Sequence, residues 1–174
     1  MKLNRKLAQL AKERGICEEW YNVLLKTEDV GELLKMALRG IDFCLSEEYP
    51  PLPFIREHFV GVMEPYGFHL DEEIQARNSE FVVAFGNCTG AAEYTDFAVG
   101  QVFVKHGSKL VIKASGNAFV MVDVFDETEV EIITSDNAKV CVNQYGGNLT
   151  TTTDDEAGEG NSIIKVIRKQ SKTY

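Results

Sequence analysis

Five acidic residues stand close together in the sequence and are the first candidates for chemistry: Asp123, Asp126, Glu127, Glu129 and Glu131. They alternate with aliphatic residues, so several of their side chains should lie on an outward face of a strand. Such a row could bind calcium, or present paired carboxylates as glycoside hydrolases do. The glycine-rich motif of calcium-binding β-rolls is absent, however, and a solvated acidic face is the simpler interpretation.

Other candidate groups do not converge in the sequence. His58, His69 and His106 are dispersed, without H-E-x-x-H or H-x-H spacing, and no serine or cysteine stands in a G-x-S-x-G elbow. The segment 86–90 is loosely similar to a phosphate-cradling loop but lacks the Lys-Ser/Thr ending of a P-loop, so it predicts a turn between two strands. The acidic, glycine-containing stretch 154–160 predicts a polar loop.

Cys17, Cys44, Cys88 and Cys141 are far apart and form no C-x-x-C pair, so neither a zinc site nor a dense disulfide framework is indicated. We predict that they are buried free thiols. We assign no catalytic, cofactor-binding or metal-binding residue, and this pattern favours a protein that is not an enzyme.

The elements that would position these groups are strands of a repeating unit. Ser115–Val122 matches Ser135–Val142 at Ser, Asn, Ala and two Val positions, and V-x-V-like pairs at 102/104 and 82/84 extend the series by steps of 18 and 20 residues. A second strand follows a polar turn in each unit, with its inward positions at 110/112, 130/132 and, more weakly, 149/151. One unit cannot bury its inward row, whereas stacked units close an aliphatic column, so the pattern predicts a β-solenoid.

The corners and edges of this solenoid have their own signals. Asn117 and Asn137 should occupy equivalent corners, where asparagine tolerates the left-handed conformation and its amides could stack. Residues 162–169 predict a final edge strand, whose lysine and arginine residues would prevent aggregation. The exposed edge could instead be an oligomer interface.

The first third of the chain predicts helices. An apolar stripe over residues 3–11 indicates a helix that ends near Gly15, and the pattern continues over residues 16–24. Thr27 is the predicted N-cap of a longer helix over residues 30–45. Pro53 predicts the first turn of a short helix, and the aromatic residues of this region predict its core.

We therefore predict an α+β protein. A helical N-terminal or capping module over residues 1–72 would precede a short single-stranded β-helix, right-handed and with about 4–5 coils, over residues 80–174. The polar stretch 71–79 would separate the two.

Composition excludes several classes of protein. The chain has 44% hydrophobic residues and a net charge of −9, with basic residues concentrated near its two ends and an acidic middle. An acidic middle argues against binding of nucleic acid, which needs clustered Lys and Arg. No apolar run approaches the length of a membrane span, so we predict a cytoplasmic protein that does not contact membranes.

The segments Gly40–Leu45, Phe54–Phe59 and Glu64–Gly67 resemble those of uncharacterised proteins encoded by phages and mobile elements of gut bacteria, with a helical N-terminal module and a β-solenoid. This resemblance implies a phage-associated structural or interaction role and transfers no functional residue. The sequence thus predicts a non-enzymatic structural or protein-interaction module with a protein partner or self-association. The alternative is a carbohydrate-binding or carbohydrate-processing β-helix protein, suggested by acidic and aromatic side chains on the solenoid faces.

Overall fold

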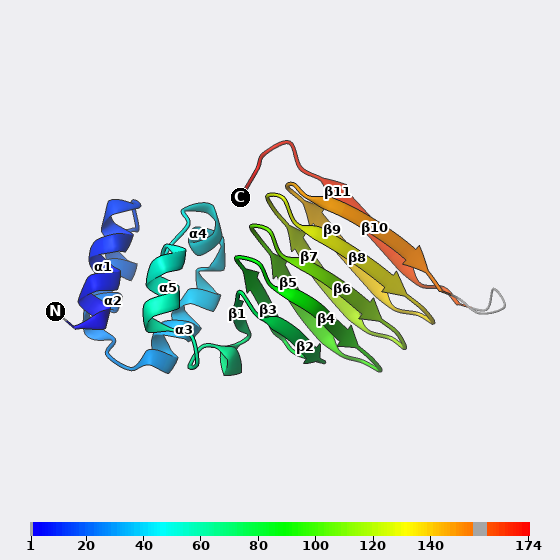
Figure 1. Cartoon of the computed structure of the whole chain (residues 1–174), viewed down its shortest axis with the longest axis horizontal. Coiled ribbons are helices and arrows are strands. Elements are labelled where there is room, and N and C mark those ends of the chain that lie inside the picture. Colours follow the sequence, from blue (N-terminus) through cyan, green and yellow to red (C-terminus); the bar gives the residue numbers. More distant parts are fainter. Residues whose placement is uncertain (1, 155–159) are drawn as a thin grey trace. The chain divides into compact units, whose positions relative to one another are not determined.

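The computed structural model describes residues 2–154 and 160–174. The chain forms two compact units. One is helical and comprises the residues up to Tyr66 together with Thr173–Tyr174, and the other comprises Gly67–Lys172 and consists of parallel strands (Figure 1). The helical unit contains α1 (Leu3–Glu13), α2 (Glu18–Lys26), α3 (Val30–Arg39), α4 (Ile41–Ser46), α5 (Leu52–His58) and the short 3₁₀ helix η1 (Glu64–Tyr66).

The helical unit follows the predicted order with two corrections. Helix α1 ends before Gly15, which has a φ of 84°, as predicted. The N-cap of α3 is Asp29, whose side chain accepts a hydrogen bond from the Glu32 N–H, so the prediction of Thr27 was wrong. The single helix predicted over residues 30–45 is divided at Gly40, which has a φ of −113° and a ψ of 37°. Glycine has a low helix propensity, and an apolar stripe does not report such a break.

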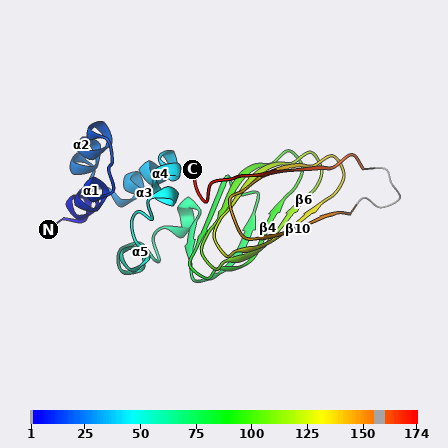
Figure 2. The same cartoon turned by 90° about the horizontal axis from the view of Figure 1, so that it is seen from above.

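The second unit is a β-solenoid of about five turns, which confirms the predicted fold class. Successive strands alternate between two parallel sheets, so each coil is a flattened loop (Figure 2). Sheet A has the strand order β1-β3-β5-β7-β9-β11, and sheet B has the order β2-β4-β6-β8-β10. The strands are β1 (Phe68–Leu70), β2 (Glu73–Arg77), β3 (Phe81–Phe85), β4 (Thr89–Tyr94), β5 (Val99–Val104), β6 (Lys109–Ala114), β7 (Phe119–Val124), β8 (Glu129–Thr134), β9 (Lys139–Gln144), β10 (Asn148–Thr153) and β11 (Ile163–Arg168).

The register of the central coils confirms part of the predicted repeat and corrects part of it. Val120 lies opposite Val140, as the matching segments predicted. Val102, however, lies opposite Val122 rather than opposite Val120, whose partner is Gly100. The predicted step of 18 residues was therefore wrong at this point, because a glycine at the first inward position hid the true alignment.

The solenoid also begins earlier than predicted. Strands β1 and β2 pair with β3 and β4, so the polar stretch 71–79 is part of the first coil rather than a boundary between units. Only Ile74 and Ala76 of β2 face the core, and the polar residues between them concealed the strand.

The core is a column of inward side chains from both sheets. In the middle coils these side chains are almost completely buried, as at Val122 and Ile132. At one place in the core a large residue of one sheet faces a glycine of the other. The Tyr94 ring lies beside Gly100, where an added Cβ atom would be 2.2 Å from Tyr94 Cε1. The larger tyrosine of sheet B thus fills the space that the glycine of sheet A leaves.

The corners share one backbone device. In each four-residue corner of the central coils, the second residue has a positive φ, and these residues are Asp96, His106, Gly116, Asp126 and Asp136. The residues predicted for this conformation, Asn117 and Asn137, follow one position later and are exposed. Their backbone N–H groups donate to the carbonyl oxygens of Asp96 and Gly116 in the preceding coil, at 2.6 and 2.9 Å. The predicted left-handed asparagines were therefore wrong by one residue.

Candidate functional site

The outer face of sheet A carries a group of exposed apolar side chains. Val99 at the start of β5 is 63% exposed, and Phe97, in the corner that precedes β5, is 80% exposed, which is unusual for residues of this type. Val99 lies beside Phe119 on the neighbouring strand, and this row continues through Lys139 to the exposed Ile163. We call the following residues the apolar surface: Phe97, Val99, Phe119, Met121 and Ile163.

The exposed residues on the outer face of sheet B are mostly polar. Lys109 Nζ lies 2.9 Å from Glu129 Oε1 on the adjacent strand, and Lys113 Nζ lies 3.9 Å from Glu93 Oε1. The neighbouring Val111 is only half exposed between these charged side chains. Ion pairs between neighbouring strands therefore occupy the positions that apolar side chains occupy on sheet A.

The five acidic residues predicted to share an outward row are divided among three places. Glu129 and Glu131 are exposed on the outer face of sheet B, as predicted for part of the row. Asp123 belongs to sheet A, where it is buried and accepts a hydrogen bond of 2.8 Å from Asn143 Nδ2. Asp126 and Glu127 lie in the corner between these strands. Because the corner reverses the chain, acids before and after it face opposite directions.

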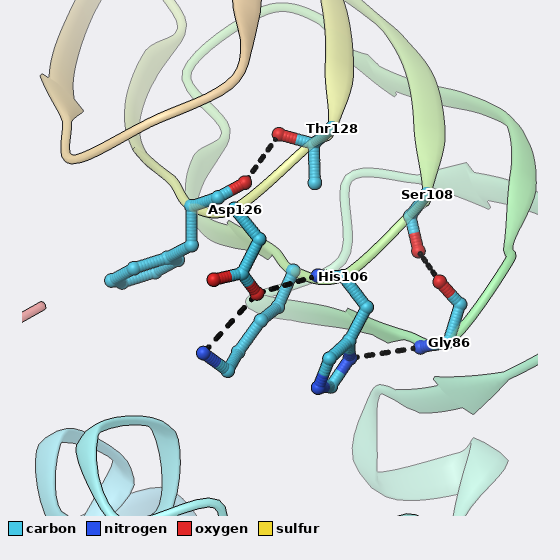
Figure 3. A network of polar contacts seen from close by, with 7 residues as sticks. Gly86, His106, Ser108, Asp126 and Thr128 are labelled. Atoms are coloured by element: carbon cyan, nitrogen blue, oxygen red, sulfur yellow. Dashed lines mark hydrogen bonds and ion pairs between the residues drawn. The ribbon is translucent and has the colours of Figure 1, made fainter. Parts of the chain in front are cut away.

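The corner after β7 contains a network of polar contacts with the corners before it (Figure 3). Asp126 Oδ2 accepts a hydrogen bond of 2.9 Å from the His106 backbone N–H and lies 3.3 Å from Lys105 Nζ. His106 Nδ1 in turn accepts from the Gly86 N–H at 3.0 Å. The Ser108 hydroxyl donates to the Gly86 carbonyl at 3.2 Å, and the Thr128 hydroxyl donates to the Phe125 carbonyl at 2.8 Å.

This network has the chemistry of a structural ladder. The contact between an aspartate and a backbone N–H in the preceding coil recurs at the opposite corner, where Asp136 Oδ2 accepts from the Gly116 N–H at 2.8 Å. A carboxylate that accepts from a left-handed backbone position stabilises the turn. The recurrence of the contact at two corners assigns Asp126 and His106 to the stacking of coils.

Aromatic side chains accompany the same corner, and sequence analysis missed them. The Phe125 and Tyr145 rings are stacked with their centroids 4.9 Å apart, and Lys105 Nζ lies 5.4 Å from the Phe125 centroid. Burial, followed by the nearby Asp123 carboxylate, raises the pKa of Tyr145. These side chains could have been predicted from the sequence, because Phe85, Lys105, Phe125 and Tyr145 recur every 20 residues.

The remaining predicted residues lie in separate elements. His58 is in α5, and His69 Nδ1 lies 2.6 Å from Glu72 Oε1 at the start of the solenoid. Residues 86–88 form the corner between β3 and β4, which confirms the turn predicted over 86–90 for its first three residues, whereas Thr89 and Gly90 begin β4. The acidic loop predicted over 154–160 lies, apart from its two ends, outside the described residues.

The cysteines are free thiols, but not all are buried. Cys44 and Cys88 are buried, and burial raises the pKa of Cys44 to about 12 and also raises that of Cys88. Cys141 is half-buried on the outer face of sheet A, and Cys17 is exposed, so the prediction of burial was wrong for Cys17. Cys17 is the N-cap residue of α2 and precedes Glu18 and Glu19 of its first turn.

Comparison with known proteins gave no relative: no protein-family model, curated protein or solved structure matches the chain. The fold therefore defines its class, a protein with a helical unit and a β-solenoid of two parallel sheets. None of the helices in the described residues is long and apolar enough to cross a membrane.

Proposed function

We propose that this chain is a non-enzymatic protein-interaction module, in which the apolar surface of sheet A binds a protein partner. The observation that carries the proposal is the contrast between Val99 and Phe119, which are exposed, and the charged side chains at the corresponding positions of sheet B; the exposed Phe97 lies in the corner next to Val99. A cluster of exposed apolar side chains is costly in water and is typical of an interaction site.

The solenoid supports this surface rigidly. Each strand of sheet A between its two edges is hydrogen-bonded to two parallel neighbours, and every inward side chain of the middle coils is buried. The outward side chains are therefore held at the fixed spacing of a β-sheet, about 4.8 Å between strands. A preorganised surface loses little conformational entropy when a partner binds, which favours affinity.

The charges around the apolar surface indicate the chemistry of the partner. Lys139 lies in the same row as Val99 and Phe119, and Lys165 lies beside Cys141 in the next row. Both lysines are exposed. A partner with an apolar centre and acidic residues at its rim would complement this face.

Two further expectations belong to this proposal. The resemblance to phage and mobile-element proteins favours a phage-associated role. The free cysteines favour a reducing compartment such as the cytoplasm, because oxidising compartments promote disulfides.

Site-specific photocrosslinking tests the proposal in cells that produce the protein. A photoreactive phenylalanine analogue at position 119 should give discrete adducts with a protein, and the same analogue at Glu131 on sheet B serves as the control. The variants Val99→Ser and Phe97→Ser should reduce the adducts from position 119. Equal adducts from both faces, or none from position 119, would contradict the proposal.

A glycan array with the purified protein separates the carbohydrate alternative. Selective retention of one glycan that is lost in Phe97→Ser would replace the protein partner by a sugar, since exposed aromatic rings also stack on sugars. Turnover of a substrate by the purified protein would overturn the non-enzymatic part of the proposal.

A further inference from the structure

The last coil of the solenoid has two open strand edges in the described part of the chain. Strand β10 bonds only to β8, and β11 bonds only to β9. The backbone N–H groups of Asn148 and Asp154 donate to Thr128 and Thr134 of the preceding coil. Because donors alternate in direction along a strand, the N–H groups of 149, 151 and 153 point away from the solenoid.

The same reasoning fixes the edge of β11. The N–H groups of Ile163 and Lys169 donate to the carbonyl oxygens of Ala138 and Gln144. The N–H groups of 164, 166 and 168 therefore point away from the coil below. The last coil thus presents backbone donors and acceptors from both of its strands on one end surface.

Apolar side chains lie between these two edges. Leu149, Ile164 and Val166 continue the inward columns of the core, but they are only partly buried, whereas Val140 and Val142 one coil earlier are fully buried. The end of the solenoid therefore combines unpaired strand edges with an incomplete hydrophobic core. An additional coil of the same shape would complete both.

We propose that a second copy of this chain occupies this end surface, through a two-fold axis parallel to the strands. This axis places β10 of one copy antiparallel to β11 of the other, so that two identical ladders form at once. Charge favours this arrangement over a two-fold axis perpendicular to the strands, which would pair β10 with β10 and β11 with β11 of the second copy. Lys165 and Arg168 on β11 would then repel their equivalents, whereas β10 carries no charged residue.

A two-fold arrangement also closes the assembly. Head-to-tail stacking would need the first coil to accept the last one, but β1 has only three residues against the six of β11. Tail-to-tail pairing uses the same surface on both copies, so it ends at a dimer instead of growing into a fibre. This inference uses a different surface from the apolar surface of sheet A and does not depend on the proposed function.

Analytical ultracentrifugation of the full-length protein tests the inference. The wild type should be a dimer at micromolar concentration. Thr151→Pro removes an N–H group that points away from the preceding coil, and it leaves every β10 N–H group that donates to β8 in place. It should therefore raise the dissociation constant of the dimer by about tenfold or more, while the circular dichroism spectrum stays unchanged. Thr151→Val is the matched control, since it retains the N–H, and it should remain dimeric.

A second variant protects the test against a folding defect of the proline variant. Ile164→Lys adds a charge to the half-exposed core of the end surface and should also give monomers. A wild type that is monomeric, or a dimer that persists in Thr151→Pro and Ile164→Lys, would overturn the inference. A dimer that is instead lost in Phe119→Ser would overturn it too, and would assign self-association to the apolar surface.

Discussion

The two sheets of the solenoid contribute similar side chains to its interior but different side chains to its surface. Inward, Val120 and Val122 of sheet A are buried to the same degree as Val130 and Ile132 of sheet B. Outward, Phe119 of sheet A is exposed, whereas the corresponding strand of sheet B carries Glu129 paired with Lys109.

Inward and outward positions of such a fold carry different kinds of information. Inward positions must be small or aliphatic to fill a narrow column, so they report the architecture and little else. Outward positions alternate with them and are free of this constraint. A group of large exposed apolar side chains on sheet A, but not on sheet B, therefore points to a role that packing does not require.

The largest expected difference is between thiols on the surface and thiols in the interior. Cys17 and Cys141 should react with iodoacetamide at pH 8 at least about a hundredfold faster than Cys44 and Cys88, because burial excludes the reagent and a raised pKa keeps the buried thiols protonated. Mass spectrometry of the labelled peptides over time measures the rates. Similar rates at all four cysteines would contradict the described burial.

The raised pKa of Cys44 also gives a pH dependence. The contribution of the Cys44 thiol to the stability of the folded state is fully present below the ordinary cysteine pKa of 9.0. This contribution is lost as the pH rises towards the folded-state pKa of about 12, because the thiol of the unfolded chain releases its proton first. The wild type should therefore lose stability above pH 9 more steeply than Cys44→Ala, as measured by urea unfolding at several pH values.

The second expected effect tests whether the two interiors are equivalent. Val122→Ala in sheet A and Val130→Ala in sheet B should each lower the free energy of unfolding by about 2 kcal/mol, because each leaves a cavity in the same column. Urea denaturation measures both, with the outward Met121→Ala as the control that should cost less. A cost confined to one sheet would show that the interiors are not alike.

The third effect concerns Tyr94 of sheet B and Gly100 of sheet A, where a large core residue compensates for a glycine. The Tyr94 hydroxyl is buried and has no hydrogen-bond partner in the described structure, and burial raises its pKa. Tyr94→Phe should therefore stabilise the fold by about 1 kcal/mol. Gly100→Val should destabilise it, and adding Tyr94→Ala should restore stability by copying the next coil, where Ala114 lies opposite Tyr94 in sheet B and Val120 lies opposite Gly100 in sheet A. Thermal unfolding that ranks the variants otherwise would contradict the packing.

The smallest effect lies on the outer face of sheet B. A double-mutant cycle on Lys109 and Glu129 should give a coupling of a few tenths of a kcal/mol that vanishes in 1 M NaCl, because both side chains are exposed. The equivalent cycle on Val99 and Phe119 of sheet A should not weaken with salt. A coupling that depends on salt on both faces would remove the contrast between them.

The sequence predicted the repeating architecture because the inward and corner positions are constrained in every coil. Ser115 and Ser135 begin equivalent corners, and their match revealed the period. The first coil was missed because it is shorter: Phe68 pairs with Val83 and Glu73 with Thr89, so its residues fall outside the 20-residue step.

The candidate site was less predictable than the fold. The 20-residue step places Phe97 and Phe119 with residues of other types, Asn117 and Lys139, so the aromatic residues could equally have been core residues, and the structure shows that both are exposed. The acidic residues between 123 and 131 were predicted to form one row because acidic and aliphatic residues alternate over this segment. The segment contains a corner, however, and the chain reverses its direction there. Local patterns describe strands well, but they do not report which residues form the turn between them.

The identical register of the central coils has a consequence for the length of the molecule. Strands β5, β7 and β9 pair residue for residue at a constant offset, and β6 pairs with β8 in the same way. Tandem duplication of residues 115–134 would therefore insert one complete rung in the same register, with each residue stacked on its own copy, and would lengthen the stack by about 4.8 Å. Small-angle X-ray scattering would detect the increment, and the length of the solenoid could then be increased in steps of one coil.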